Sequence, residues 1–349
     1  MSSRNTLENF EVDRIIQQLV HYQTVSIIGM EKNVGKTTTL NFIISRIRTR
    51  YKLGLTSIGR DGETIDVVTA TAKPRIYIEK GTIIATAKQC VEQSDITKEI
   101  LANTCIGTPL GEIIIVRALS DGYIEIAGPS QTEYLSQICN ELLKLGCELV
   151  LVDGALSRKT FAAPSITDAT ILATGASLSR NMDAVSEMTA HTVRLLSFDK
   201  LKNPHIMKLT EQISRVGIID KNEIVKNLQM TTALDSELEI INSLSKDMQY
   251  LVIKGAVSDN LLIRLMENSL LYKEFTLLVA DGTKLFLSKD ILYQYEKTGG
   301  KILVLSPIKI LCLTANPFSP LGYEFDPKQF LSTLRCKISL PIFDLVGGN

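Results

Sequence analysis

The hydrophobic positions of the first 200 residues follow two spacings in turn. Short continuous apolar runs, such as TVSIIG at residues 24–29, are typical of strands buried on both faces in a parallel sheet. The next apolar positions recur every three or four residues, the spacing of a helix with one buried face: Leu40, Ile43, Ile44 and Ile47. This order predicts a strand, a loop and then a helix.

Three later segments repeat the buried-strand pattern: LGLTSIG from Leu53, CELVLVDG from Cys147 and DATILATG from Asp168. A helix is predicted in residues 129–146, where Ser130 and Glu133 have the spacing of a capping box and Gly146 ends the apolar periodicity. Strands that alternate with helices in this way predict an α/β fold with a mostly parallel sheet.

Between Lys73 and Gly128 the pattern changes to short apolar alternations. They are separated by turns that contain glycine, such as Asp121-Gly122. A period of two with Asp-Gly turns is typical of β-hairpins. We therefore expect an antiparallel hairpin excursion attached to the main sheet.

A polar segment with a proline, DKLKNPHI at residues 199–206, interrupts the pattern as linkers between domains do. Beyond it, strand-like runs alternate with helical segments: RVGIID, YLVIKG, TLLVADG and KILVLSP. We predict one α/β domain at residues 1–200 and a second, smaller α/β domain at residues 201–349, a candidate for binding a partner. The proline-rich tail from Ala315 is expected to wrap the second domain.

Composition excludes several classes of partner. Basic and acidic residues balance at 38 each, so no net field attracts nucleic acid or an anionic membrane. No apolar run approaches the roughly 20 residues that span a bilayer, and the start of the chain is too polar for a secretory signal. The 6 cysteines are widely spaced without a C-x-x-C pair, so we expect neither disulfides nor a zinc site. The protein is predicted to be cytoplasmic, without nucleic-acid or membrane partners.

The loop between the first strand and its helix, GMEKNVGKTTT from Gly29, carries the candidate chemistry. A phosphate needs converging N–H donors, close approach of the backbone and a cation, and a glycine loop before a helix N-terminus supplies them. Lys36 is placed to reach the β and γ phosphates, and the Thr37 hydroxyl to ligate Mg²⁺. The predicted nucleotide-binding residues are Asn33, Val34, Gly35, Lys36, Thr37 and Thr38. The domain at residues 1–200 is therefore predicted to be a P-loop nucleotide-binding domain.

The loop departs from the usual P-loop spacing. Five residues separate Gly29 from Gly35, against the usual four, and Met30 stands where the first glycine would fall. The variant P-loop of dethiobiotin synthetases also has five, and this segment resembles it. Lys32 lies one residue too close to Gly35 to match the extra lysine of the partitioning ATPases, so we assign it no catalytic role. An ordinary turn between a strand and a helix is the alternative interpretation.

Two aspartates join Lys36 in the predicted catalytic set, and with Thr37 they form the predicted metal-binding set. Asp153 ends the most apolar strand, where a Walker-B carboxylate would face Mg²⁺. Asp61 follows the strand after the loop's helix, a position that supplies a metal-binding or water-orienting acid in enzymes that resemble dethiobiotin synthetase, and Glu63 is its fallback. Both aspartates precede glycine, so a turn-forming role is the alternative.

Four segments together resemble the small-subunit family of the reactivases that accompany lysine 5,6-aminomutase in amino-acid-fermenting bacteria: GMEKNVGKTTTLNFII, LTSIGRDGETIDVVTATAKPRIYI, VDGALSRKTFAAPSITDATILATGASLS and LTANPFSPLG. The resemblance covers most of the chain, and only the P-loop is a widely shared motif. It implies a Mg²⁺-dependent ATPase, open to stimulation by a partner, that acts as a reactivating chaperone. The chaperone would bind an adenosylcobalamin-dependent aminomutase together with a larger ATPase subunit and exchange damaged cobalamin.

Two sequence features refine this expectation. No Asn-Lys-x-Asp signature of guanine recognition occurs, so ATP is the expected nucleotide. No Asp-x-His-x-x-Gly pattern occurs either, so the cobalamin is expected to belong to the partner.

Two other function classes stay open. One is a dethiobiotin-synthetase-like ATP-dependent ligase, although the strand that ends in TSIGRDG lacks the substrate lysine of those enzymes. The other is a non-hydrolysing nucleotide-sensing regulator, in which the second domain binds a protein partner. Mg²⁺-dependent phosphate release, measured with and without an aminomutase, distinguishes the three classes.

Overall fold

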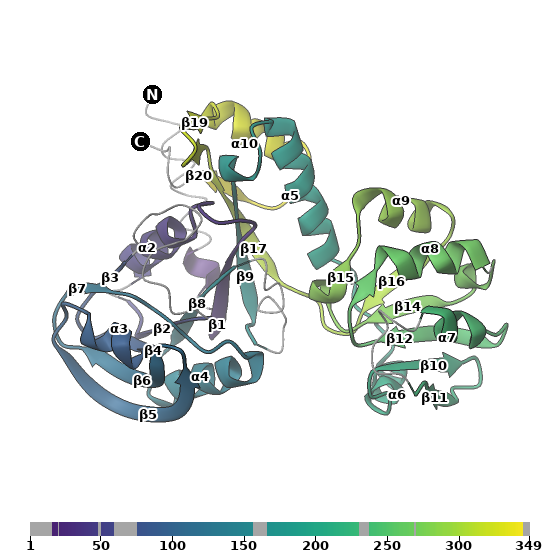
Figure 1. Cartoon of the computed structure of the whole chain (residues 1–349), viewed down its shortest axis with the longest axis horizontal. Coiled ribbons are helices and arrows are strands. Elements are labelled where there is room, and N and C mark those ends of the chain that lie inside the picture. Colours follow the sequence, from purple (N-terminus) through teal and green to yellow (C-terminus); the bar gives the residue numbers. More distant parts are fainter. Residues whose placement is uncertain are drawn as a thin grey trace. The chain divides into compact units, whose positions relative to one another are not determined.

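The protein is a mixed α/β structure with a large, mostly parallel sheet, as the hydrophobic pattern predicts (Figure 1). The computed structural model describes residues 16–19, 21–47, 50–58, 75–155, 166–229, 237–268 and 270–344. These residues form two compact units, one within Met1–Ala190 and Lys309–Asn349 and the other within His191–Ile308. The division between the units falls inside helix α5 (Met182–Leu196).

The described residues of the first unit contain a nine-stranded sheet in the order β20, β17, β9, β1, β8, β2, β4, β6, β5. Neighbours from β20 to β4 pair in parallel, and β6 is antiparallel to both β4 and β5. In sheet order, the strands are Ile342–Asp344, Ile310–Asn316, Ala169–Gly175, Thr24–Gly29, Leu149–Ala155, Leu53–Ser57, Ile83–Ala87, Gly111–Ala118 and Lys98–Thr108. The predicted strand at residues 24–29 is β1 itself.

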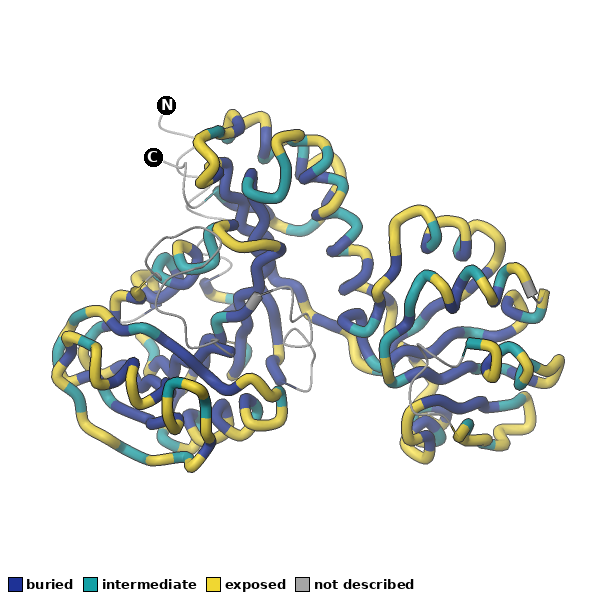
Figure 2. Tube along the Cα trace, viewed as in Figure 1, coloured by how far each residue is buried: buried dark blue, intermediate teal, exposed yellow. Residues whose placement is uncertain are grey.

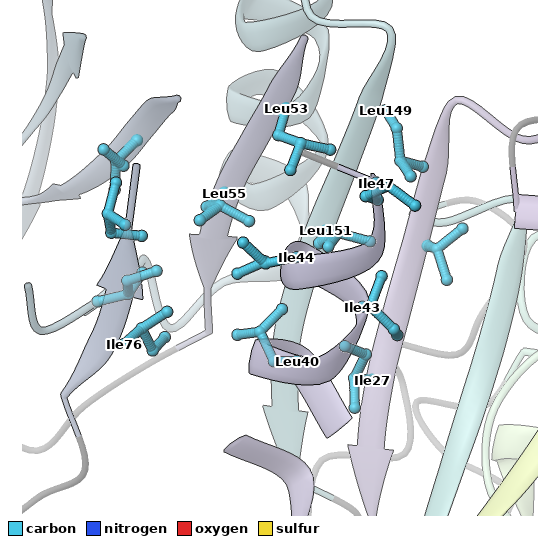
Figure 3. Packing of buried hydrophobic residues seen from close by; sticks show 14 of the residues in the cluster. Ile27, Leu40, Ile43, Ile44, Ile47, Leu53, Leu55, Ile76, Leu149 and Leu151 are labelled. Carbon is cyan, nitrogen blue, oxygen red and sulfur yellow. The ribbon is translucent and has the colours of Figure 1, made fainter. Parts of the chain in front are cut away.

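Helices cover both faces of this sheet. Successive side chains of a strand point to opposite faces, so an apolar strand needs a helix packed on each side to bury all of them. In β8, Leu151 packs in one buried cluster with α2 (Lys36–Ile47), and Val152 packs in another with α4 (Thr132–Lys144). Figure 3 shows the α2 side, where apolar side chains of the helix meet those of β1, β2 and β8: Ile27, Leu40, Ile43, Ile44, Ile47, Leu53, Leu55, Leu149 and Leu151. The helical spacing read from the sequence is therefore the buried face of α2.

The antiparallel edge of the sheet confirms the predicted hairpin region. Strands β5 and β6 form its long hairpin, and β3 (Ile76–Ile78) and β7 (Gly122–Ile124) form a separate antiparallel pair. The sequence pattern did not predict β5 or the short helix α3 (Lys88–Glu92). The pairing of β5 with β6 shifts register twice, and Cys105 has a φ of +57°, so the strand lacks the period of two that marks a regular strand.

The start of α4 differs from the predicted capping box. Gln131 is the N-cap and makes no capping hydrogen bond through its side chain, so Ser130 precedes the cap. Contacts outside the helix explain the shift, because the Gly128 N–H donates to Ser57 Oγ at 3.2 Å and holds the approaching chain on β2. The end of the helix is as predicted, with Gly146 in the left-handed conformation at φ +91°.

The C-terminal tail belongs to the sheet of the first unit, so the prediction that it wraps the second domain is wrong. Strand β17 lies between β9 and β20 and pairs with both in parallel. The two compact units accordingly do not follow the predicted division into residues 1–200 and 201–349. The reason is that β17 pairs with a strand far away in the sequence, which no local pattern reveals. The tail's other elements are β18 (Phe318–Ser319), β19 (Tyr323–Glu324) and α10 (Pro327–Arg335).

The second unit is built on a smaller sheet, and all four strands predicted beyond residue 206 are present in it. Its described residues contain five strands in the order β11, β10, β12, β14, β16. Strands β12, β14 and β16 pair in parallel, whereas β10 is antiparallel to both neighbours. In sheet order, the strands are Val225–Asn227, Val216–Asp220, Met248–Ile253, Thr276–Val279 and Lys301–Val304.

Two groups of buried side chains flank this smaller sheet, and Figure 2 shows its inner strands β10, β12 and β14 as largely buried. Leu251 of β12 joins the group with α7, α8 and α9, and the next residue, Val252, joins the group with α6. Helices α6 to α9 span Pro204–Glu211, Glu237–Asn242, Asp259–Asn268 and Lys289–Lys297. The remaining described elements are the parallel pair β13 (Val257–Ser258) and β15 (Leu285–Phe286), and the 3-10 turns Ala176–Leu178, Leu270–Lys273 and Gly282–Lys284.

None of the helices in the described part of the chain is both long and apolar enough to cross a bilayer.

Candidate functional site at the glycine-lysine loop

The loop at residues 30–35, which we name the GK loop, joins β1 to α2. Two of its residues have a left-handed backbone, Asn33 with φ +62° and Gly35 with φ +88°. Glycine adopts this conformation without a steric penalty, and asparagine tolerates it better than most residues. The GK loop therefore owes its sharp turn to residue types that its sequence supplies at the required positions.

Helix α2 begins at Lys36, directly after the GK loop. The N–H groups of its first turn have no acceptor within the helix, and the positive end of the helix dipole lies beside the loop. The Thr39 N–H donates to Gly35 O at 2.9 Å and closes this turn. Thr37 is half-buried and Thr38 is exposed. The six predicted nucleotide-binding residues thus surround one helix N-terminus.

The Lys36 side chain folds back over the GK loop. Its Nζ donates to Glu31 O at 3.0 Å. A β-carbon at Gly29 would lie 2.6 Å from Lys36 Cγ and Cδ and 2.7 Å from a methyl of Val34, so the glycine leaves the room that the lysine stem occupies. The first glycine of the sequence motif is therefore required by close packing.

Burial lowers the pKa of Lys36. The carboxylates of Asp153 and Glu31 oppose this shift, and the neighbouring charge of Lys32 adds to it. A lysine that is partly removed from water interacts more strongly with an incoming anion than an exposed lysine does.

Asp153 lies on β8, the strand next to β1. In the register of the sheet it stands opposite Ile27 of β1 and Ser57 of β2, near the carboxyl ends of these parallel strands. The residue is half-buried, and its charge raises the pKa of Lys36. The structure therefore brings together two of the three predicted catalytic residues, Lys36 and Asp153.

The third predicted catalytic residue, Asp61, and its fallback, Glu63, lie outside the described residues. Of the predicted metal ligands, Thr37 is placed in the first turn of α2 and Asp153 at the carboxyl end of β8. Within the described ranges, no three His, Cys, Asp or Glu side chains gather as a metal site. The described part of the chain thus supplies one hydroxyl and one carboxylate to the predicted set.

Asn316, which the sequence analysis did not single out, contacts the GK loop from β17. Its Nδ2 donates to Asn33 O at 2.9 Å, and its Oδ1 accepts from the Phe318 N–H at 3.1 Å. Asn316 and Asn33 are 283 residues apart, so no local spacing links them. The one feature of the sequence that could have indicated Asn316 is its position as a polar residue at the end of an apolar, buried strand.

Strands β9 and β17 hold the base of the site on the side of β1 opposite to β8. The Met30 N–H donates to Ala173 O of β9 at 2.9 Å. The hydroxyl of Thr39 in α2 lies 2.9 Å from that of Thr314 in β17. The start of the GK loop and the first turn of the helix that follows it are therefore tied to neighbouring strands.

No protein-family model matches the sequence, and no curated protein matches it. The residues themselves indicate the chemistry. A helix N-terminus and a half-buried lysine attract an anion, and a nearby carboxylate attracts a cation. Together they suit an anion that carries a metal ion, such as a nucleotide with bound Mg²⁺.

Proposed function

We propose that the GK loop binds the phosphates of ATP in a P-loop nucleotide-binding domain. The observation that carries this proposal is the setting of Lys36, a half-buried cation with a lowered pKa at the N-terminus of α2. The left-handed residues Asn33 and Gly35 support it, because turns of this kind let successive N–H groups face one anion.

In this proposal the backbone of residues 33–38 and the Lys36 ammonium hold the β and γ phosphates. The Thr37 hydroxyl and Asp153 are the described residues that would hold Mg²⁺, directly or through water, and Asp61 is the further ligand expected from the sequence. When bound, Mg²⁺ neutralises charge on the phosphate oxygens. The tight space at Gly29 supports the fit, because any larger residue there would displace the lysine.

We further propose that the protein is the ATP-hydrolysing subunit of a reactivating chaperone in the cytoplasm. Its client is an adenosylcobalamin-dependent aminomutase, and a larger ATPase subunit is its partner. The support is the resemblance of four sequence segments to the reactivases of lysine 5,6-aminomutase. Nucleotide binding opens a client only as far as its affinity differs between the closed and open states. Cobalamin exchange on this account requires a client that changes the affinity for ATP.

Calorimetric titration of the chain with ATP and Mg²⁺ tests the first proposal. Lys36→Ala is expected to abolish measurable ATP affinity, because it removes the cation beside the phosphates. Lys32→Ala is the matched control, since it removes the same charge from an exposed position of the GK loop and is expected to change the affinity far less. Tight ATP binding by folded Lys36→Ala protein would refute the proposed phosphate site.

Phosphate release tests the second proposal. Asp153→Asn is expected to keep ATP binding and lose Mg²⁺-dependent turnover, and wild-type turnover is expected to respond to an aminomutase. Turnover that instead requires a small carboxylic acid would indicate a ligase, the alternative favoured by the five-residue spacing between Gly29 and Gly35. Tight binding without any phosphate release would indicate a nucleotide-sensing regulator.

A further inference from the structure

We propose that Asn316 is a positioning residue that holds the GK loop in its phosphate-binding shape, an inference that rests on the proposed function. The residue contacts the loop through the hydrogen bond from its Nδ2 to the carbonyl of Asn33. Asn33 is the left-handed residue ahead of Gly35. In an anion nest the N–H groups face the ligand and the carbonyls face away. A donor on the Asn33 carbonyl therefore fixes the loop from the side opposite to the phosphates.

The amide of Asn316 is itself held in one orientation. Its Oδ1 accepts from the Phe318 N–H at 3.1 Å, which leaves Nδ2 as the end that faces the GK loop. The residue is only 9% exposed, so its amide is packed among protein atoms. An amide with its oxygen engaged elsewhere presents a donor to the loop, and Asn33 O is the acceptor that it meets.

Strand β9 approaches Asn316 closely. A β-carbon at Gly175 would lie 2.6 Å from Asn316 O and 3.0 Å from Asn316 Cβ. The absence of a side chain at Gly175 thus lets the end of β9 pack directly against the residue. Contacts from β9, from Phe318 and from the GK loop converge on Asn316, so its position is set before any ligand arrives.

A residue that shapes the loop acts on every ligand that the loop holds through phosphate groups. A residue that contacts the base of a nucleotide acts only on ligands with a base. Comparing Mg²⁺-ATP with inorganic tripolyphosphate, which carries phosphates alone, separates these two roles of Asn316. Both affinities are measured by calorimetry on the full chain.

Asn316→Ala is expected to weaken both ligands by the same factor, roughly three- to tenfold, the range for loss of one hydrogen bond. In Asn316→Asp the side chain keeps its shape and its acceptor for the Phe318 N–H, but a carboxylate oxygen faces Asn33 O in place of the donor. This variant is therefore expected to lower the affinity for both ligands at least as much as Asn316→Ala. The matched control is Thr170→Val, which removes the buried 2.8 Å contact between the hydroxyls of Thr170 and Ser26. This control is expected to leave both affinities unchanged.

Equal loss for both ligands supports the inference. Loss of ATP affinity alone overturns it and assigns Asn316 to the base, and lower thermal stability with both affinities unchanged overturns it in favour of a purely structural role. If neither variant folds, amide hydrogen exchange on the wild-type chain decides. Tripolyphosphate is expected to slow exchange of the Phe318 N–H, which donates a hydrogen bond to Asn316 Oδ1. An unchanged exchange rate at Phe318 overturns the inference. A wild-type chain that binds neither ligand refutes the proposed function itself, and this inference with it.

Discussion

Lys36 is subject to two opposing demands. Burial destabilises its charged form and lowers its pKa, whereas a phosphate site needs the charge. The carboxylates of Asp153 and Glu31 offset part of the effect of burial. The residue therefore costs the empty protein some stability and gives it a cation whose attraction for anions is only weakly screened by water.

We expect ATP affinity to fall as the pH rises through the lowered pKa of Lys36, because the neutral amine no longer attracts phosphate. The stability effect has the opposite sign. Between the lowered pKa and the ordinary value of 10.5, the unfolded chain binds more protons than the folded chain, so the contribution of Lys36 to the free energy of unfolding rises with pH.

Calorimetry with ATP from about pH 7 to about pH 10 measures this dependence. Lys36→Arg is the control, because its guanidinium stays charged throughout and other lysines titrate equally in both proteins. Parallel pH profiles for the wild type and Lys36→Arg would show that Lys36 does not carry the dependence.

At the scale of elements, the segment that leads into α4 is fixed to the end of β2. The Gly128 N–H donates to Ser57 Oγ at 3.2 Å, and this hydroxyl donates to Ile126 O at 3.0 Å. A β-carbon at Gly128 would lie 1.6 Å from Ser57 O. The backbone of this segment thus passes closer to β2 than any residue with a side chain permits.

Gly128→Ala is expected to lower the free energy of unfolding by about 2 kcal/mol or more, because the obstructing atom belongs to backbone within the sheet and cannot move aside. Urea denaturation followed by circular dichroism measures the change. Gly107→Ala is the control, since a β-carbon there meets no atom within 4 Å. Equal losses for the two variants would contradict the packing argument.

At the scale of the whole molecule, the first unit is assembled from both ends of the chain. All seven residues of β17, Ile310–Asn316, are buried, and the strand pairs with β9 on one side and β20 on the other. Residues 191–308 are therefore inserted, in sequence, between two parts of one sheet. The strand that returns from this insertion ends at Asn316, which bonds the GK loop.

A fragment that ends at residue 200 is expected not to form a stable monomer, because β9 loses its pairing with β17 and exposes an unpaired, apolar strand edge. Size-exclusion chromatography and urea denaturation test this. A variant with residues 191–308 replaced by a long flexible linker retains β17 and is expected to unfold cooperatively. A cooperative, monomeric 1–200 fragment would contradict the assignment of β17 to the first unit.

The predictions were confirmed where the spacing of apolar residues within one short segment determines its structure. The apolar run at residues 24–29 is buried on both faces, and the helical spacing from Leu40 to Ile47 is the buried face of α2. The placement of Asp153 on the strand next to β1 needs more than one segment, because it follows from the carboxyl ends of parallel strands meeting at the same edge of the sheet. Strand β5 was not predicted, because its bulges break the alternation of apolar and polar residues. The prediction of Ser130 as the N-cap of α4 was wrong, because contacts of the preceding segment with β2 determine where the helix begins.

Backbone periodicity, glycine and helix geometry are local properties, so residues 24–47 alone were sufficient to predict the strand, the loop after it and the helix that follows. Only the tertiary structure shows that β17 lies beside β9 and that Asn316 donates a hydrogen bond to Asn33. These contacts join residues as far as 283 positions apart. Strands pair in a parallel sheet because burial of their apolar side chains is favourable, and this pairing produces no regular spacing that could be recognised in the sequence.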